Sequence, residues 1–250
     1  MTQDNPTDDH VGHRAVVRRR EGHDVTNDGC TSSYDAHMSR FPLLTHLDED
    51  QRRDTLSKAR RRRFKRNEAI IREGDPGDSL HLIDKGHVAI RITTVDGSVS
   101  TMRILGTGDQ FGEMAALAGD PRMATAVALD EVETLSLHRD VILQLRATTP
   151  AIDRALLDSA LAEVKRLSNA LTEVIHEPVA TRIARQLDRL RVVFDGDVIP
   201  LTQDDLAGLC GTTRQTANQV LQDMQLVGTI SVTRGKVTVL DPVVLARSAR

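Results

Sequence analysis

Residues 201–222 read LTQDDLAGLCGTTRQTANQVLQ, and this pattern predicts two short helices joined by a tight turn. Thr202 can cap the first helix, because a threonine hydroxyl accepts from the free amides at a helix start. Gly211 stands where the chain must turn through positive φ, which glycine adopts without strain. Thr212 or Thr213 can cap the second helix. The stretch therefore predicts a helix-turn-helix.

The second helix of this motif has an apolar face and a polar face. The residues expected to face inward are Ala217, Val220, Leu221 and Met224, and those expected to face outward are Arg214, Gln215, Asn218 and Gln219. Such side chains near a helix start can read base edges in the major groove, where arginine suits guanine and glutamine suits adenine. The motif therefore predicts sequence-specific binding to double-stranded DNA.

A hairpin is expected directly after the motif. Residues 230–232 and 237–240 show the alternation expected of β-strands, and they flank a turn at Arg234-Gly235-Lys236. This turn would place the cations of Arg234 and Lys236 beside DNA phosphates. The sequence thus predicts a winged helix-turn-helix, and the alternative is an interaction module that does not touch DNA.

A long helix is expected between Thr149 and Pro178, because proline disrupts the helical ladder. Its apolar residues recur at alternating spacings of three and four, and they are Leu157, Ala160, Val164, Leu167, Leu171 and Val174. We call these six residues the seam. This spacing is typical of a coiled coil, so two copies of the chain should pair along it. The alternative is a long helix that lies on its own β-domain.

Residues 64–138 predict an antiparallel β-roll or barrel. Short β-branched and aliphatic runs alternate there with turns rich in Gly and Asp, and Asp96-Gly97 suits a hairpin. The expected strands are residues 69–72, 80–84, 87–95, 98–105, 125–129 and 132–138. A domain of this type can act as a container for a small molecule.

Composition limits the remaining possibilities. The chain has 250 residues, a net charge of −3 and 28% charged residues, with no apolar run near the roughly 18 residues of a spanning helix. Its first thirty residues lack the apolar stretch of a signal peptide, so we expect a cytoplasmic protein without membrane contact. Residues 1–40 have no periodicity and are expected to form a disordered extension. Its histidines, His10, His13 and His23, are too scattered to suggest a metal site.

The order of these parts resembles the CRP/FNR superfamily of bacterial transcription regulators. The resemblance rests on EGDPGDSLHLIDKGHV (residues 73–88), FGEMAALAGDPRMAT (111–125), TPAI from Thr149 and LTQDDLAGLCGTTRQTANQVL from Leu201. It implies an α+β fold with an effector-sensing β-roll of the jelly-roll type (41–148), a dimerisation helix (149–177) and a winged helix-turn-helix (178–250). It also implies a homodimer on a palindromic operator, base contacts from Arg214, Gln215 and Gln219, and contact with RNA polymerase if the protein is an activator.

The segment 111–125 contains groups that can bind a cyclic nucleotide. Gly112 and Glu113 open a short helix whose amides can face an anion, and Arg122 can neutralise a phosphate through its planar fork. Glu113 can accept from a ribose hydroxyl. The resemblance implies cyclic AMP or another cyclic nucleotide as the effector, with no certain cofactor. The residues expected at this site are Gly112, Glu113, Met114, Arg122, Met123, Leu167 and Ser168.

Two of these residues depart from the family pattern. The family pattern has a serine directly after the phosphate-binding arginine, and this chain has Met123 there. The pattern also has two hydroxyl residues that face adenine on the long helix. Here the first is replaced by Leu167, and the second is kept as Ser168. Leu167 also extends the apolar seam, which would favour pairing of the helices without a ligand. The alternative for the β-roll is that Glu113 and Arg122 pair with each other and no nucleotide binds.

The sequence gives little indication of an iron–sulfur, haem, metal or catalytic site. The two cysteines, Cys30 and Cys210, cannot hold an iron–sulfur cluster, and His81 and His87 are more typical of packed strand residues than of haem ligands. We find no catalytic nucleophile–base pair and no metal-spacing motif, so we expect neither an enzyme nor a metal site. The competing function is a cyclic-nucleotide-binding signalling module that acts through protein contacts, with a non-functional helix-turn-helix.

Overall fold

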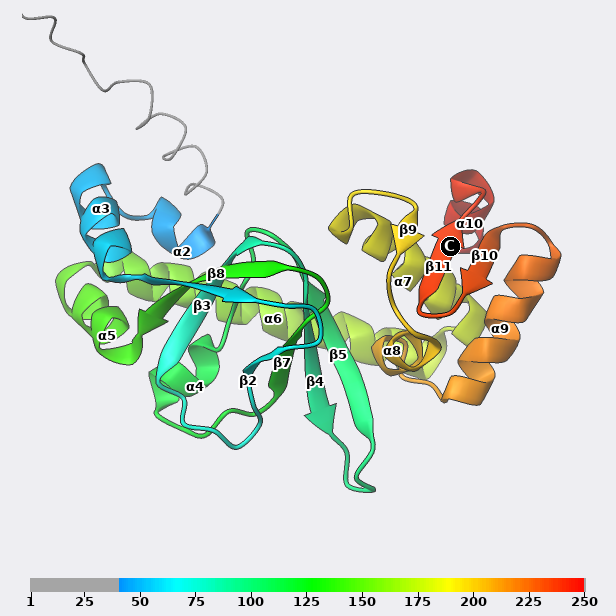
Figure 1. The fold of residues 1–250 in the computed structure, drawn as a ribbon, viewed down its shortest axis with the longest axis horizontal. Coiled ribbons are helices and arrows are strands. Elements are labelled where there is room, and N and C mark those ends of the chain that lie inside the picture. Colours follow the sequence, from blue (N-terminus) through cyan, green and yellow to red (C-terminus); the bar gives the residue numbers. More distant parts are fainter. Residues whose placement is uncertain (1–40, 250) are drawn as a thin grey trace, which may run out of the picture.

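The computed structural model describes residues 41–249. A β-roll lies at one end and a winged-helix lobe at the other, and the long helix α6 (Pro150–His176) runs along both (Figure 1). The expected extension, residues 1–40, and Cys30 within it lie outside the described residues. No helix between residues 41 and 249 combines the length and apolar character needed to cross a membrane.

The β-roll consists of two four-stranded antiparallel sheets, with strand orders β1-β8-β3-β6 and β2-β7-β4-β5. The first sheet contains β1 (Arg60–Phe64), β8 (Val132–His138), β3 (Ser79–Lys85) and β6 (Gln110–Phe111). The second contains β2 (Ala69–Ile71), β7 (Thr125–Ala128), β4 (Val88–Thr93) and β5 (Val99–Leu105). A buried cluster that includes Ile83, Val88, Leu105 and Phe111 fills the space between the sheets. The predicted antiparallel roll is confirmed.

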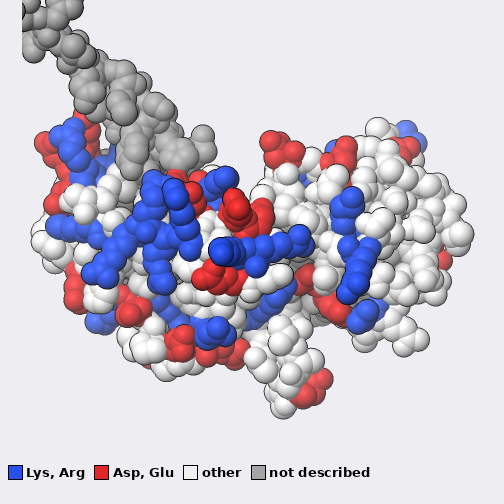
Figure 2. Space-filling model, in the orientation of Figure 1, with Lys and Arg blue, Asp and Glu red and all other residues white. Residues whose placement is uncertain are grey.

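One edge strand was not expected from the sequence. In β1 four consecutive arginines are exposed and only Phe64 is buried, so the strand has no apolar alternation to reveal it. Pairing with β8 holds it in the sheet, from Arg60 opposite Ser136 to Phe64 opposite Val132. Figure 2 shows the resulting band of Lys and Arg side chains on this side of the β-roll.

Short helices close the roll. They are α2 (Pro42–Thr45), α3 (Glu49–Lys58), α4 (Glu113–Ala118) and α5 (Arg139–Thr148). At the start of α3, the Asp48 side chain accepts from the Gln51 amide at 2.8 Å and the Gln51 side chain accepts from the Asp48 amide, which satisfies two free donors. A second buried cluster, which includes Leu44, Leu80 and Ile152, packs α2 and the start of α6 against the roll.

Helix α6 extends from Pro150 to His176, close to the predicted limits. Ile152 and Ala155 in its first turns are buried against the β-roll. Every residue of the seam is exposed in the single chain, with Leu171 at 62% and Leu167 at 46%. The seam therefore does not lie on the protein's own β-roll, and its apolar side chains are available to a second copy.

The winged-helix lobe follows α6. Its elements are α7 (Val179–Val193), β9 (Val198–Ile199), α8 (Gln203–Leu209), α9 (Arg214–Leu226), β10 (Ile230–Thr233), β11 (Lys236–Val239) and α10 (Pro242–Ser248). The strands form a sheet in the order β10-β11-β9. Thr202 caps α8 and Thr213 caps α9, while Gly211 between them has a φ of +58°. The expected helix-turn-helix and its hairpin are confirmed.

The two lobes are in direct contact. Asp205 in α8 accepts from Arg91 of β4 at 2.9 Å and from Thr101 of β5 at 2.7 Å. A Cβ added to Gly208 would lie 2.7 Å from the Thr101 amide nitrogen, so only glycine lets α8 approach β5 this closely. Ala89, Ile104 and Leu129 of the roll belong to the buried cluster of the winged-helix lobe. This interface is a structural route between the β-roll and the helix-turn-helix.

The turn of the motif also touches the end of α6. The buried Arg182 donates to the Val174 carbonyl at 2.7 Å and to the Gly211 carbonyl at 3.4 Å. A Cβ on Gly211 would lie 2.9 Å from a methyl of Val174. The end of the seam therefore packs against the turn that orients α9.

Candidate functional site

A cavity of about 220 Å³ lies between the β-roll and α6. Its walls come from β2, β4 and β5, from residues 110–115, from residues 122–124 and from α6. Six of the seven expected effector residues line it, namely Gly112, Glu113, Met114, Arg122, Met123 and Leu167. The structure thus brings together residues that are far apart in the sequence.

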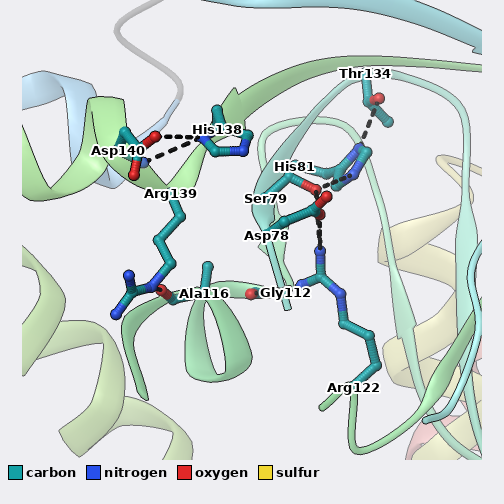
Figure 3. Close-up of polar contacts among 10 residues, drawn as sticks. All are labelled: Asp78, Ser79, His81, Gly112, Ala116, Arg122, Thr134, His138, Arg139 and Asp140. Atoms are coloured by element: carbon teal, nitrogen blue, oxygen red, sulfur yellow. Dashed lines mark hydrogen bonds and ion pairs between the residues drawn. The ribbon is translucent and has the colours of Figure 1, made fainter. Parts of the chain in front are cut away.

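Arg122 is buried at one end of the cavity with only 4% of its surface exposed. Its guanidinium donates to the Gly112 carbonyl at 2.9 Å and to the Ser79 hydroxyl at 3.0 Å, as Figure 3 shows. Its carboxylate partner is the exposed Asp78, whose Oδ1 atom is 3.5 Å away. Burial lowers the pKa of Arg122 from its ordinary value, although nearby carboxylates oppose this. A buried guanidinium with so weak an ion pair is suited to an anionic ligand.

Glu113 lies beside this arginine without pairing with it. Its Oε2 atom is buried and has no hydrogen-bond partner among the described residues. Burial raises the pKa of the Glu113 carboxyl. Gly112 before it has a φ of +84°, and a Cβ there would lie 2.7 Å from the Arg122 Nη1 atom. The Glu113–Arg122 pair considered from the sequence is absent from the described structure, which leaves the carboxylate open to a donor such as a hydroxyl.

The remaining effector candidates occupy different positions. The side chains of Met114 and Met123 are largely exposed at the cavity, so they offer apolar surface to a ligand. Leu167 lines the cavity from α6. Ser168 is not among the lining residues, and its hydroxyl donates to the Val164 carbonyl at 2.9 Å within α6.

Three charged residues at the α6 side of the cavity were not expected from the sequence. Glu163 of α6 accepts from Arg103 of β5 at 2.8 Å and from Arg166 at 2.7 and 2.9 Å. All three line the cavity, and the two arginines lower the pKa of the Glu163 carboxyl through the Arg166 hydrogen bond and both charges, against burial. Arg103 lies in a predicted strand and Glu163 in a predicted helix, so only the tertiary fold reveals the cluster.

The recognition face of α9 is open. Arg214, Gln215 and Gln219 are exposed, and Ala217 and Leu221 on the other side are buried. Arg214 pairs at 3.2 Å with Asp204, and both side chains are more than half exposed. Exposed ion pairs of this kind contribute about 0–1 kcal/mol, so a base or phosphate can replace Asp204 at little cost.

The other expected DNA-contacting residues surround this face. Asn218 is half-buried and accepts from the Gln203 side chain at 2.9 Å, which fixes its amide. Thr212 lies in the turn, and Thr202 and Thr213 cap α8 and α9. In the wing, Arg234 and Lys236 are exposed on either side of Gly235, which has a φ of +70°.

The histidines of the β-roll have their ring nitrogens engaged. His81 lies within 3.1 Å of the Thr134 hydroxyl and 3.4 Å of the Ser79 hydroxyl, and burial lowers its pKa to about 3 (Figure 3). His87 contacts Asp130 at 2.6 Å and the Val193 carbonyl at 3.0 Å. Between residues 41 and 249 no group of three or more His, Cys, Asp or Glu side chains could hold a metal ion. Burial raises the pKa of the Cys210 thiol to about 12, which makes it unreactive.

Two family descriptions match successive parts of the chain. Residues 61–149 match the cyclic nucleotide-binding domain, and residues 181–248 match the Crp-like helix-turn-helix domain. The first match contains Gly112, Glu113 and Arg122 of the cavity, and the second contains α9 and the β10–β11 hairpin.

Full-length relatives share this arrangement. The chain is 34% identical over 194 residues to the CRP-like cAMP-activated global transcriptional regulator of Mycobacterium tuberculosis, covering 75% of this chain and 87% of the relative. It is 29% identical over 212 residues to the cyclic AMP receptor protein of Thermus thermophilus, covering 85% and 98%. A solved CRP-family transcriptional regulator from Thermus thermophilus superposes with a TM-score of 0.64 at 25% identity, over 75% of this chain and 96% of that one.

Proposed function

The chain belongs to the CRP/FNR family of DNA-binding transcription regulators, and on this premise we propose that a cyclic nucleotide in its β-roll controls how it engages an operator. The protein is a regulator and not an enzyme. In the proposal, Arg122 holds the cyclic phosphate, Glu113 accepts from a ribose hydroxyl, and α9 reads the operator.

The observation that carries the effector proposal is that one cavity holds a buried guanidinium with a distant counterion and a buried carboxylate oxygen with no donor. Arg122 is 4% exposed and its Asp78 partner lies 3.5 Å away, while the buried Oε2 of Glu113 has no hydrogen-bond partner in the described part of the chain. Leaving a buried polar atom such as Glu113 Oε2 unpaired costs about 1–3 kcal/mol. A cyclic nucleotide supplies an anion for the first and a hydroxyl donor for the second. Its two contacts therefore match what the cavity lacks.

The exposed seam supports a homodimer in this proposal. Two copies of α6 would bury facing leucines and valines, and two recognition helices related by a twofold axis would meet a palindromic operator with half-sites one helical turn apart. We further propose that the dimer acts in the cytoplasm and contacts RNA polymerase if it activates transcription.

Calorimetric titration of the full-length protein with cyclic AMP and cyclic GMP tests the effector proposal. At least one nucleotide should bind the wild type, and Arg122→Ala should weaken it by about tenfold or more because a charge-assisted phosphate contact is lost. Arg139→Ala is the matched control, since Arg139 donates to the Ala116 carbonyl outside the cavity. Equal losses in the two variants would contradict the role of Arg122.

Footprinting on genomic fragments separates this function from the competing one. A regulator protects a palindrome, whereas a signalling module with a non-functional helix-turn-helix protects nothing. The open face of α9 favours the regulator, because Arg214, Gln215 and Gln219 are all available to bases.

A further inference from the structure

We propose that the effector cavity selects a guanine base over adenine, and that Arg103 is the residue that discriminates between them. This inference rests on the proposed function, because it assumes that a cyclic nucleotide occupies the cavity. It concerns the end of the cavity that faces α6.

The arrangement of the cavity sets where the base lies. Arg122 and Glu113 account for the phosphate and the ribose, and both belong to the wall formed by residues 110–124. The base must then extend toward the remaining walls, which come from β2, β4, β5 and α6. Ile71 and Ile90 make the β2 and β4 walls apolar, whereas Arg103, Glu163 and Arg166 line the cavity on β5 and α6. A base that reaches α6 therefore meets a charged cluster beside apolar side chains.

The charge of this cluster favours acceptors. Two arginines share one carboxylate, so the cluster carries a net charge of about +1 at neutral pH. Glu163 already accepts three hydrogen bonds from the two guanidinium groups, and a carboxylate has about four lone-pair sites. Arg103 donates one hydrogen bond, from Nη1 to Glu163, and its Nη2 and Nε groups make none in the described part of the chain. The Nη2 and Nε groups of Arg103 can therefore donate hydrogen bonds to a ligand.

Guanine and adenine differ at the edge that such donors would meet. Guanine presents N7 and O6, which are both acceptors, and an arginine fork can donate to the two together. Adenine presents N7 and the N6 amino group, which is a donor and would face the guanidinium donors. The 2.8 Å contact with Glu163 holds Arg103 at the cavity wall before the base arrives. Arg103 thus penalises adenine as well as favouring guanine.

Neither Leu167 nor Ser168 of α6 supplies a hydrogen bond that would recognise adenine. Leu167 is the α6 residue next to the cluster in the cavity, and its side chain offers no hydrogen bond. The Ser168 hydroxyl is engaged with the Val164 carbonyl and does not line the cavity. Leu167 and the exposed Met114 and Met123 provide apolar contact, which does not distinguish the two purines.

Calorimetric titration of the full-length protein with cyclic GMP, cyclic IMP and cyclic AMP tests the inference. Cyclic IMP keeps O6 and N7 but lacks the 2-amino group, so it should bind like cyclic GMP, and both should bind about tenfold or more tightly than cyclic AMP. Arg103→Leu should weaken cyclic GMP and cyclic IMP by about tenfold and leave cyclic AMP within about threefold. Arg139→Leu should change none of the three affinities.

Each opposing outcome has a separate meaning. Cyclic AMP binding as tightly as cyclic GMP would overturn the inference and leave the proposed effector function intact. Cyclic IMP behaving like cyclic AMP would assign the selection to the 2-amino group and remove Arg103 from it. Equal weakening of all three nucleotides by Arg103→Leu would place Arg103 at the phosphate. Absence of binding by all three to the wild type would remove the proposed effector itself. The wild-type comparisons do not depend on the folding of any variant.

Discussion

Arg214 is the residue of α9 that we expect to read a guanine in the operator. It is exposed at the first position of α9 and is held only by a surface pair with Asp204. Arg214→Ala should cost about 1–3 kcal/mol of operator affinity and relax specificity at one base pair. Selection from random DNA measures this, and recovery of the wild-type operator by the variant would contradict the assignment.

Gln215 and Gln219 should shape the rest of the operator. Glutamine prefers adenine, whereas the family resemblance implies an acidic residue at 215 and a basic one at 219. The selected operator should therefore differ from those of relatives at the base pairs that these residues face. Gln219 also donates to Asp223 at 3.1 Å, which orients its amide on the exposed face.

His87 makes the contact between the lobes sensitive to pH. Burial lowers the pKa of His87, but its hydrogen bond and ion pair with Asp130 and its contact with the Val193 carbonyl raise the pKa more, so the net shift is upward. A histidine whose pKa is higher in the folded than in the unfolded state stabilises the fold when it is protonated. This stabilisation is complete below the unfolded-state pKa of about 6.5 and is lost as the pH rises through the folded-state pKa. The free energy of unfolding of the wild type should therefore fall as the pH rises from about 6.5 through the folded-state pKa.

His87→Gln should remove this part of the pH dependence, while the exposed His138→Gln should keep it. Urea denaturation across a pH series measures both. The pKa of Asp130 is lowered, because the His87 contacts outweigh burial, so its contribution is present above a pH of about 3.9 and is lost only in more acidic solution. Identical pH profiles for His87→Gln and the wild type would contradict the assignment.

At the residue scale, local sequence was sufficient to group Arg122 and Glu113 as candidates for one site, and the structure places both in one cavity. Arg122 and Glu113 lie nine residues apart around one short helix, and their types suggest a phosphate and a hydroxyl. The Arg103–Glu163 pair joins a strand to a helix sixty residues later, and neither position has a local signal. Such long-range charge clusters depend on how the elements pack.

At the scale of elements, the wing provides a test of phosphate contact. Arg234→Ala and Lys236→Ala should weaken binding to all DNA sequences about equally, because phosphates carry no sequence information. Each substitution should also lower the slope of log affinity against log salt concentration by about one, because one phosphate contact is lost. Both side chains are exposed, so folding should be unaffected. Unchanged salt dependence in the double variant would remove the wing from the interface.

The docking of α8 on the β-roll gives a second test at this scale. Arg91→Leu removes the 2.9 Å contact with Asp205 but leaves the Thr202–Asp205 capping box intact. Because Arg91 is partly exposed, we expect a loss of about 1 kcal/mol, which corresponds to roughly fivefold faster hydrogen exchange in α8 and β5. Arg234→Ala is the control. Unchanged exchange in Arg91→Leu would show that the apolar contacts alone hold the lobes together.

The elements themselves were predictable to the extent that they show alternation or periodicity. The strands β3, β5 and β8 follow β-branched and aliphatic runs, and α6 follows its seam. Strand β1 could not be predicted, because its arginines show no strand pattern. Pairing with β8 and ion pairs with residues such as Glu133 hold it in the sheet. Strand β6 has only two residues, which is too short for any pattern.

For the whole molecule, the seam runs from the candidate effector cavity to the helix-turn-helix. Leu167 lines this cavity and also belongs to the seam, and Val174 at the end of the seam contacts the turn at Gly211. Two facing leucines pack without a ligand. We therefore expect the wild-type dimer to favour its DNA-binding state partly without an effector, which reduces the visible effect of a nucleotide.

The operator affinity of Leu167→Thr, with and without a saturating cyclic nucleotide, tests most directly whether the effector controls DNA binding. Without nucleotide the variant should bind the selected operator at least about tenfold more weakly than the wild type, some 1.4 kcal/mol, and the nucleotide should restore the affinity. Fluorescence anisotropy with labelled operator measures it, and analytical ultracentrifugation confirms that the dimer is intact. Equal operator affinities for the intact variant dimer and the wild type, unchanged by nucleotide, would contradict the account.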